Sequence, residues 1–503
     1  MKTTFQILGI LFLIIYTSCN EPTPSPSSDL PNIIIILADD LGYGDIGVLN
    51  PDSKIPTPNL DRLASEGIIF SDAHSPSAVC TPTRYGLLTG RYSFRTRLQS
   101  GVLVGHAPSL IEPARITVAS LLKESGYHAA SVGKWHLGLD FKKKNSDVPL
   151  YAGDDWDIES TENIDYQAIV DGGPCDHGFD YSFILPASLD MQPYVFINNK
   201  YVFQPEINHI DGVGVLEDRG LFWRHGDASR GFDFWQVLPL LTQKANRFIR
   251  DHVENHPKQP FFLYFPLTAP HMPWLPTDEF KGKSQAGDYG DFVAQVDYSV
   301  GQVMNLIDSL EIAENTLVFF TSDNGSHWLP EEIEQFDHKA NYIFRGMKSD
   351  VWEGGHRVPL LVKWPNVIQG DSRSDQMACL TDMLATFAEL TGKDMPWNTG
   401  EDSFSFLYAL EGKNPTWPVR YTMINHSANG LFALRNGEWK FIDGRGSGGW
   451  SYEGKETEPP GQLYNLTNDP GETANLYNQY PEKVEEMKNM LEMYKKEQRS
   501  RFK

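Results

Sequence analysis

The sequence predicts an α/β fold built on a large, mixed but mostly parallel sheet that is sandwiched by helices. Two observations predict it. Strand-like apolar runs alternate with helix-like segments from residue 31 onward. Polar clusters follow closely after four of the expected strands. With 503 residues, 40% of them hydrophobic, the chain is long enough for one large or two ordinary domains.

The first half of the expected domain contains alternating strands and helices. Residues 33–37 are an uninterrupted run of Ile and Leu, which is typical of a strand buried on both faces. A helix is expected after Thr57, with Pro58 at its first position and a stop at Gly67. The remaining expected elements are a strand at 68–70, a helix capped by Thr117, a strand at 127–132, a strand at 261–267, a helix over 292–307 and a strand at 316–321.

The pattern changes beyond about residue 395. Residues 431–434 and 439–442 are expected to pair as strands around a turn, and residues 444–460 to form a loop. Residues 481–499 form a charged amphipathic helix. We therefore expect a main domain at 31–394, carrying the polar clusters, and a smaller α+β subdomain with an antiparallel sheet at 395–503.

The N-terminus is typical of an exported protein. Lys2 precedes an apolar run over 7–16 that is too short to span a membrane, so residues 1–19 are predicted to be a signal peptide. Cys19 lies where a bacterial lipoprotein is cleaved and lipidated; ordinary secretion with an unmodified Cys19 is the alternative. Residues 20–30 are rich in Pro and Ser and are expected to be a flexible tether. The predicted location is the periplasm, or the outer membrane or cell surface through the lipid anchor.

The composition also limits the partners. The chain has 43 basic and 66 acidic residues, for a formal net charge of −23. A chain this acidic is not expected to bind nucleic acid or an anionic membrane through its overall field. An anionic substrate would require cations concentrated at its site.

The four polar clusters predict one site. In open α/β sheets, sites collect at the carboxyl ends of strands. Adjacent buried acids are costly unless a cation or donors neutralise them, and oxygen ligands favour calcium or magnesium over zinc. The clusters are Asp39-Asp40, Gly133-Lys134-Trp135-His136, His271 and Asp323-Asn324.

A fifth cluster is Cys80-Thr81-Pro82-Thr83-Arg84. Pro82 is expected to open a helix whose first-turn amides point toward Cys80. A thiol in that position could be a nucleophile with a lowered pKa. The alternative is a small residue packed at a helix start.

This pentapeptide resembles the signature of the type I, formylglycine-dependent sulfatases, an arylsulfatase-like family of the alkaline phosphatase superfamily that includes bacterial polysaccharide sulfatases. Gly133-Lys134-Trp135-His136-Leu137-Gly138 and Ser322-Asp323-Asn324-Gly325 also match the family, which usually has Ser in place of Thr83. The resemblance implies the alkaline-phosphatase/sulfatase fold. It also implies that a formylglycine-generating maturation enzyme oxidises Cys80 during export.

The resemblance further implies a cofactor and residue roles. One calcium ion would be held by Asp39, Asp40, residue 80, Asp323 and Asn324. Arg84 and Lys134 would hold the hydrated aldehyde at residue 80. Lys134 and Lys348 would bind the sulfate oxygens. His271, or Lys348 beside it, would protonate the leaving oxygen, and His136 would take a proton from the second hydroxyl so that sulfate is expelled.

The predicted reaction is hydrolysis of sulfate monoesters on a sulfated polysaccharide or its oligosaccharides. An algal polysaccharide, such as ulvan or a sulfated galactan, and a glycosaminoglycan both fit an exported enzyme rich in aromatic residues. Candidate sugar contacts, for each of which simple packing is the alternative, are Asp190, Arg224, His225 and His426. Trp223, Trp274 and Trp328 lie in segments that could also line a sugar cleft. Two other functions stay open: a phosphonate or phosphate monoester hydrolase on the same scaffold, and a non-catalytic glycan-binding surface lipoprotein with an unmodified Cys80.

Overall fold

A computed structural model describes residues 30–148, 150, 163–215, 220–413 and 419–502. The predicted signal peptide, Cys19 and all of the predicted tether except Leu30 lie outside these residues. Among the helices of the described ranges, none combines the length and the apolar character needed to cross a bilayer.

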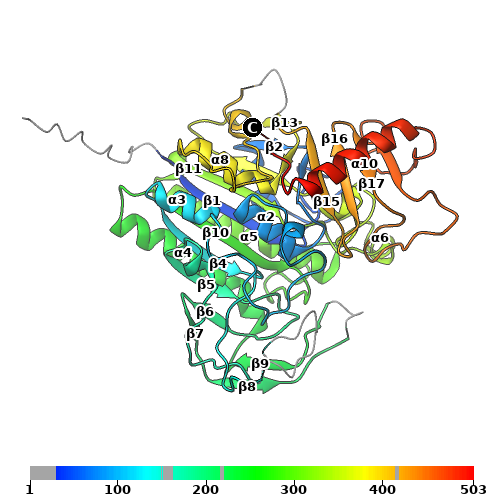
Figure 1. Cartoon of the computed structure of the whole chain (residues 1–503). Helices are drawn as coiled ribbons and strands as arrows, with labels where there is room; N and C mark the ends of the chain where they lie inside the picture. The colour runs from blue at the N-terminus through cyan, green and yellow to red at the C-terminus, as the bar shows by residue number, and fades with distance from the viewer. Residues whose placement is uncertain (1–29, 149, 151–162, 216–219, 414–418, 503) are drawn as a thin grey trace, which may run out of the picture.

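In the described ranges the main sheet has ten strands, and it is mixed but parallel through its centre (Figure 1). Strands β11, β1, β10, β4 and β5 run parallel to one another, whereas β12 and β6 are antiparallel to both of their neighbours. This confirms the predicted fold class. In sheet order the strands are β13 (Ser372–Ser374), β2 (Ile68–Phe70), β12 (Leu360–Lys363), β11 (Thr316–Ser322), β1 (Asn32–Asp39), β10 (Phe261–Pro270), β4 (His128–Lys134), β5 (Tyr181–Leu185), β6 (Phe196–Asn198) and β7 (Tyr201–Phe203).

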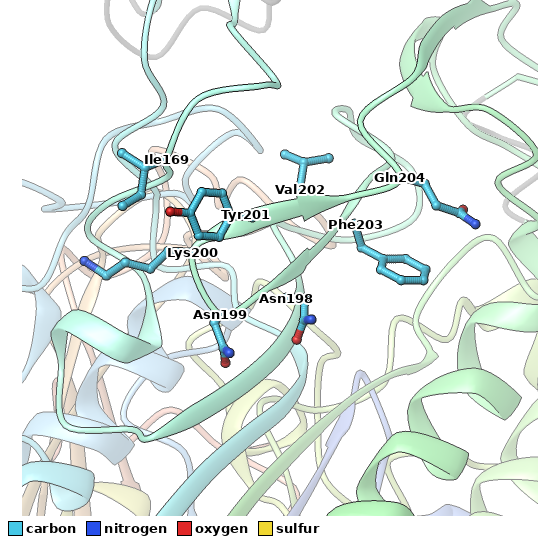
Figure 2. Close-up of a pocket in the computed structure, with 8 residues that line it drawn as sticks. All are labelled: Ile169, Asn198, Asn199, Lys200, Tyr201, Val202, Phe203 and Gln204. Carbon is cyan, nitrogen blue, oxygen red and sulfur yellow. The ribbon is translucent and has the colours of Figure 1, made fainter.

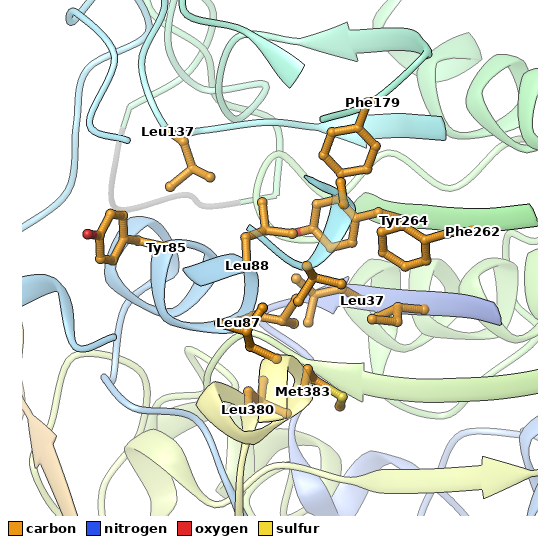
Figure 3. Close-up of a cluster of buried hydrophobic side chains, with 14 of the residues drawn as sticks. Leu37, Tyr85, Leu87, Leu88, Leu137, Phe179, Phe262, Tyr264, Leu380 and Met383 are labelled. Carbon is orange, nitrogen blue, oxygen red and sulfur yellow. The ribbon is translucent and has the colours of Figure 1, made fainter. Parts of the chain in front are cut away.

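Helices cover both faces of this sheet because its central strands are apolar on both sides. Ile33 and Ile35 of β1 join a core with α2 (Cys80–Thr89), α3 (Val118–Glu124) and α8 (Met383–Leu390). Figure 3 shows part of this core, where Leu87 and Leu88 of α2 lie over the sheet. Ile34 and Ile36 face the opposite core, which contains residues of α1 (Pro58–Ser65), α4 (Val237–Asn255) and α5 (Gly287–Ser309).

The C-terminal part of the chain forms a separate antiparallel sheet. Its order is β15 (Thr422–His426), β16 (Phe432–Asn436), β17 (Trp439–Ile442) and β18 (Gln462–Asn465), which confirms the predicted strand pair and turn. Helix α10 (Pro481–Lys496) packs Met487 and Leu491 onto this sheet. Helix α9 (Leu407–Leu410) lies after residue 395 in the chain but packs in the core of the main sheet. The domain boundary expected at residue 395 therefore stays a prediction.

Apart from short 3-10 helices, the remaining elements of the described residues are two strand pairs and two helices. They are β3 (Ala73–His74) with β14 (Ala378–Cys379), β8 (Ile207–Ile210) with β9 (Gly226–Ser229), α6 (Pro330–Phe336) and α7 (Glu353–His356). Helix α2 begins at Cys80, two residues before the expected start at Pro82, with Val79 as its N-cap. Cys80 is therefore itself the first residue of the helix.

Candidate active site

The parallel centre of the sheet brings the polar clusters to one edge. Asp39 is the last residue of β1 and Lys134 the last of β4, while His271 follows β10 and Asp323 follows β11. Because these strands are parallel neighbours, their carboxyl ends lie side by side. Residues of these strand ends that are separated by as many as 284 positions in the chain, such as Asp40 and Asn324, thus contact one another.

Three carboxylates and one amide form the centre of this site. The backbone N–H of Asp40 donates to Oδ1 of Asp323 at 3.1 Å, and Nδ2 of Asn324 donates to Oδ1 of Asp40 at 2.7 Å. Asp39 is fully buried, as are Asp323 and Asn324. Within the described residues, Oδ1 of Asn324 is buried without a hydrogen-bond partner. The turn is strained, since Asp40 has a φ of 65°.

Three buried cations face the carboxylates. Nζ of Lys134 lies 2.7 Å from Oδ2 of Asp39, and Nζ of Lys348 lies 2.7 Å from Oδ2 of Asp40. The guanidinium of Arg84 lies 2.7 Å from Asp323 and donates to the carbonyl of Lys134 at 2.9 Å. Three positive charges thus balance three negative charges.

The pKa values of the carboxyl groups indicate where more positive charge would be accommodated. Burial acts to raise the pKa of Asp39, but Lys134, with His271 and Arg84, holds it well below its usual range. Burial, and then the charge of Asp39, raises the pKa of Asp323 to about 7. A further cation beside Asp323 would therefore relieve repulsion within the cluster.

Cys80 lies at the edge of this cluster and faces His136. Its Sγ is 3.3 Å from Nδ1 of His136, and the side chain is only 2% exposed. Nε2 of His136 donates to the carbonyl of Leu103 at 2.7 Å, which leaves Nδ1 unprotonated in the neutral ring. Burial, assisted by Lys134, lowers the pKa of His136 well below its usual value, so the ring is neutral.

The expected lowering of the Cys80 pKa is not found. Burial raises the pKa of the thiol, and the nearby charge of Lys134 opposes this only partly. The sulfur is therefore held as a thiol and not as a reactive thiolate.

The close packing of the backbone just before Lys134 explains why residue 133 is a glycine. Gly133 has a φ of 138°, and a Cβ there would lie 1.8 Å from the carbonyl oxygen of Pro266 in β10. Only glycine lets the two strands approach this closely. His136 has a φ of 54°, a left-handed conformation that aims its ring back toward Cys80.

His271 lies on the other side of the carboxylates. Its Nε2 is 3.7 Å from Oδ2 of Asp40, and the side chain is 6% exposed. Burial, and then the charge of Lys348, lowers the pKa of His271. A small hollow that reaches Asp40 is lined by Met272, Trp274 and His327.

The expected sugar contacts separate into two groups. Oδ2 of Asp190 accepts a hydrogen bond from Arg224 at 2.8 Å, and the neighbouring His225 is exposed. The carbonyl of Pro186, four residues before Asp190, accepts from the backbone of His136, so this segment begins at the site.

The other group is buried. The ring of His426 contacts Phe94 and Phe432 and is 1% exposed, and burial lowers its pKa to about 4. Its carbonyl accepts from the backbone of Ala78, close to Cys80. This placement favours the packing alternative for His426. Trp274 and Trp328 pack on Tyr289, and Trp223 stacks on Phe234.

Sequence reasoning missed a supporting group beneath the Asp40 turn. Oδ2 of Asp45 accepts from the hydroxyl of Tyr289 and, at 2.7 Å, from the backbone of Gly42. Nε2 of His338 lies 2.8 Å from Oδ1 of Asp45. These residues come from three distant segments, and no local pattern joins them.

A second buried charged group joins the main sheet to the C-terminal sheet. Nζ of Lys440 lies 3.0 Å from Glu353 and 2.9 Å from Glu472. Glu472 also accepts from the backbone of Glu353 at 2.6 Å. His74 and His356 lie against the same cluster, with their Nδ1 atoms 3.1 Å apart. Because α7 begins five residues after Lys348, this group anchors the chain segment that follows Lys348.

Comparisons with known proteins agree with the resemblance. A family model described as Sulfatase matches residues 31–393, and one described as N-sulphoglucosamine sulphohydrolase, C-terminal, matches residues 347–500. The N-acetylgalactosamine-6-O-sulfatase of Bacteroides thetaiotaomicron is 33% identical over 98% of this chain and 100% of its own. Human arylsulfatase A is 31% identical over 89% of this chain and 83% of its own. One similar solved structure is described as belonging to the metabolism of multiple glycosaminoglycans by Bacteroides thetaiotaomicron. It matches this chain with a TM-score of 0.79 and 32% sequence identity, and the match covers 93% of this chain and 100% of that one.

Proposed function

The chain belongs to the sulfatase family, and on that basis we propose that it removes sulfate from a glycosaminoglycan through a formylglycine made from Cys80 and one bound calcium ion. The enzyme class is that of sulfuric ester hydrolases acting on sulfated glycans. The observation that carries the mechanism is the buried cluster in which three cations and three carboxylates surround residue 80.

The proposed sugar is N-acetylgalactosamine 6-sulfate within a glycosaminoglycan. Support comes from the relative of that name, which this chain matches along nearly its whole length. An algal polysaccharide is the less favoured substrate. The pair of Asp190 and Arg224 supports recognition of a polar sugar, since both residues follow the segment that begins beside His136.

The residues present fit a calcium ion. The donor set is Asp39, Asp40, Asp323 and Asn324, all of which offer oxygen. The unpartnered Oδ1 of Asn324 and the raised pKa of Asp323 both favour an added cation. When bound, calcium would supply a double positive charge for the sulfate oxygens and for the oxygen on residue 80.

The cations of the chain supply most of the remaining electrostatics. Without a metal the cluster is balanced, so an ion of charge +2 would make the site positive and complementary to a sulfate monoester. Lys134 and Lys348 would each turn an ammonium N–H toward sulfate oxygens, which stabilises the charge that develops as the ester bond breaks. Arg84 donates hydrogen bonds to both Asp323 and the carbonyl of Lys134, so it holds these two residues in place relative to each other.

Two histidines would move the protons. The maturation enzyme would convert Cys80 into an aldehyde whose hydrate supplies two hydroxyls. The unprotonated Nδ1 of His136, 3.3 Å from the side chain of residue 80, would accept a proton from that residue. His271, or Lys348 beside it, would give a proton to the departing sugar oxygen.

The N-terminal pattern supports export, with Cys19 as the proposed site of lipidation. The proposed location is the periplasm, or the outer membrane or cell surface through the lipid anchor.

The mass of the peptide that contains residue 80 tests the nucleophile. In protein made together with a maturation enzyme, we expect the mass change of thiol to aldehyde, and Cys80→Ala should abolish repeated turnover. Retained turnover in Cys80→Ala, or an unmodified thiol in fully active protein, would overturn the assignment. A matched sulfate and phosphate monoester measured side by side tests the phosphatase alternative, and a faster reaction with phosphate would support it.

Chelation tests the metal. Removing divalent ions should abolish sulfate release, and calcium should restore it more completely than magnesium. Full activity after exhaustive chelation would refute the metal assignment.

A further inference from the structure

A second polar surface lies on α4 and the adjoining edge of the main sheet. It begins at His128, the first residue of β4, whereas the active site lies at Lys134, the last residue of the same strand. Six residue steps along a strand separate these ends by about 20 Å. The surface is therefore distinct from the active site.

The outward side of α4 carries three cations in this very acidic protein. Lys244, Arg247 and Arg250 are spaced three residues apart and so lie on one side of the helix. They line a hollow of about 550 Å³ together with Gln243, Asn246 and Gln302. Among the residues that the structure describes, no carboxylate lines this hollow, although the chain has a net charge of −23.

Two further hollows extend this one. A hollow of about 470 Å³ shares Lys244 and Arg247 with the first and adds Asn198 of β6. Its lining also includes three histidines and one carboxylate, that of Asp251. Asn198 also lines a third hollow, of about 410 Å³, on the hairpin of β6 and β7 (Figure 2). We call this continuous surface, from Arg250 through Asn198 to the hairpin, the α4 strip.

The hairpin contributes exposed aromatic rings. Tyr201 is 60% exposed and Phe203 is 37% exposed. Figure 2 shows Val202 on one side of β7 and Phe203 on the other. The ammonium of Lys244 lies 5.4 Å from the exposed Phe203 ring and 4.4 Å from the buried Phe183 ring, so this cation joins α4 to the Phe203 side of the hairpin.

These residue types together match a sulfated sugar chain. Aromatic rings stack on the apolar faces of sugar rings, and side-chain amides hydrogen-bond to hydroxyls. Guanidinium groups bind oxyanions with two parallel hydrogen bonds. The ion pair of Arg247 with Asp251, at 3.3 Å, is exposed and contributes little, so a sulfate group can replace it.

We propose that the α4 strip is a second, non-catalytic binding site for a polyanionic sulfated glycan. It holds one stretch of the polymer while another reaches the active site. The identity of the glycan rests on the proposed function, whereas the location and the charge selectivity of the strip rest on its own residues.

Binding of chondroitin 6-sulfate to an immobilised Cys80→Ala protein tests the strip, because this background prevents turnover. In that background, Arg247→Ala with Arg250→Ala should weaken polymer binding about tenfold at low ionic strength. Tyr201→Ala should also weaken it, and salt should weaken it further. In the active enzyme, the double arginine variant should lower the ratio of kcat/KM for the polymer to that for a sulfated monosaccharide by about the same factor.

The matched control replaces two exposed lysines of α10, in Lys488→Ala with Lys496→Ala, which makes the same change in net charge far from the strip. It should keep wild-type polymer binding. Equal weakening by this control, unaltered binding in the arginine variant, or equal affinity for unsulfated chondroitin would each overturn the proposal. Sulfate-selective binding through the strip, in a protein whose mature form releases no sulfate from any glycan, would refute the proposed function and leave this inference intact.

Discussion

Replacing Lys440 by Met should destabilise the protein in a pH-dependent way. Lys440 is 1% exposed and forms ion pairs with both Glu353 and Glu472. Methionine fills the space of the aliphatic stem but leaves two buried carboxylates without their shared cation. Removing one partner of a buried ion pair costs about 3–5 kcal/mol, and we expect a loss of this size in mildly alkaline buffer.

The pH dependence follows from Glu472. Burial, opposed by Lys440 and assisted by Glu353, raises the pKa of Glu472 to about 7, above the value of 4.5 for an ordinary glutamate. A raised folded-state pKa means that this group favours folding at low pH, and that the contribution is lost as pH rises through about 7. In Lys440→Met we expect the pKa of Glu472 to rise further. At a pH where Glu472 must ionise, each unit of that rise lowers the free energy of unfolding by about 1.4 kcal/mol.

Urea unfolding followed by tryptophan fluorescence provides the assay. The loss of stability should be at least about 1.4 kcal/mol larger near pH 8.5 than near pH 6. Lys488→Met on the exposed side of α10 is the control, and it should stay within about 0.5 kcal/mol of wild type. A loss below about 1 kcal/mol, or one that shrinks as pH rises, would refute the reasoning about buried charge.

Three further substitutions test the site. Lys134→Ala leaves Asp39 without its closest cation, so kcat/KM for a sulfated monosaccharide should fall at least about a hundredfold; a loss smaller than tenfold would contradict its role at the sulfate oxygens. Arg224→Ala removes the ion pair with Asp190 and should raise KM for a sulfated disaccharide about tenfold with kcat retained. An unchanged KM would show that this pair does not contact the substrate. Asn324→Ala removes the unpartnered Oδ1 and should weaken calcium binding in calorimetry at least about tenfold, whereas equal affinity would show that this oxygen is not a ligand.

Much of the fold could be predicted because its signals are local. The Ile run of β1 is apolar at every position since both faces of the strand are buried, and the pattern needs no knowledge of its neighbours. The start of α2 was predicted two residues late, because the rule that places Pro in the first turn does not fix which residue of that turn it occupies. Helix α4 and the strands from β5 to β9 were not foreseen.

The chemistry of the site could be predicted only in part. Strand ends predicted that Asp39, Lys134 and Asp323 would meet, because parallel neighbours align their carboxyl ends. The hydrogen bond that the hydroxyl of Tyr289 donates to Asp45 depends on tertiary packing alone. The resistance of Cys80 to ionisation likewise follows from burial, which the pentapeptide does not encode.

The bond between Ala78 and His426 has a consequence for biosynthesis. The segment that leads into Cys80 is tied by its backbone to a strand made almost 350 residues later, and Cys80 itself is 2% exposed. A modifying enzyme that must reach the sulfur needs this segment extended and accessible. The proposed conversion of Cys80 would therefore have to take place on the nascent or translocating chain, before β15 docks. On that proposal, a chain still unconverted when β15 docks would stay unconverted, so the relative rates of modification and folding would set the fraction of active enzyme.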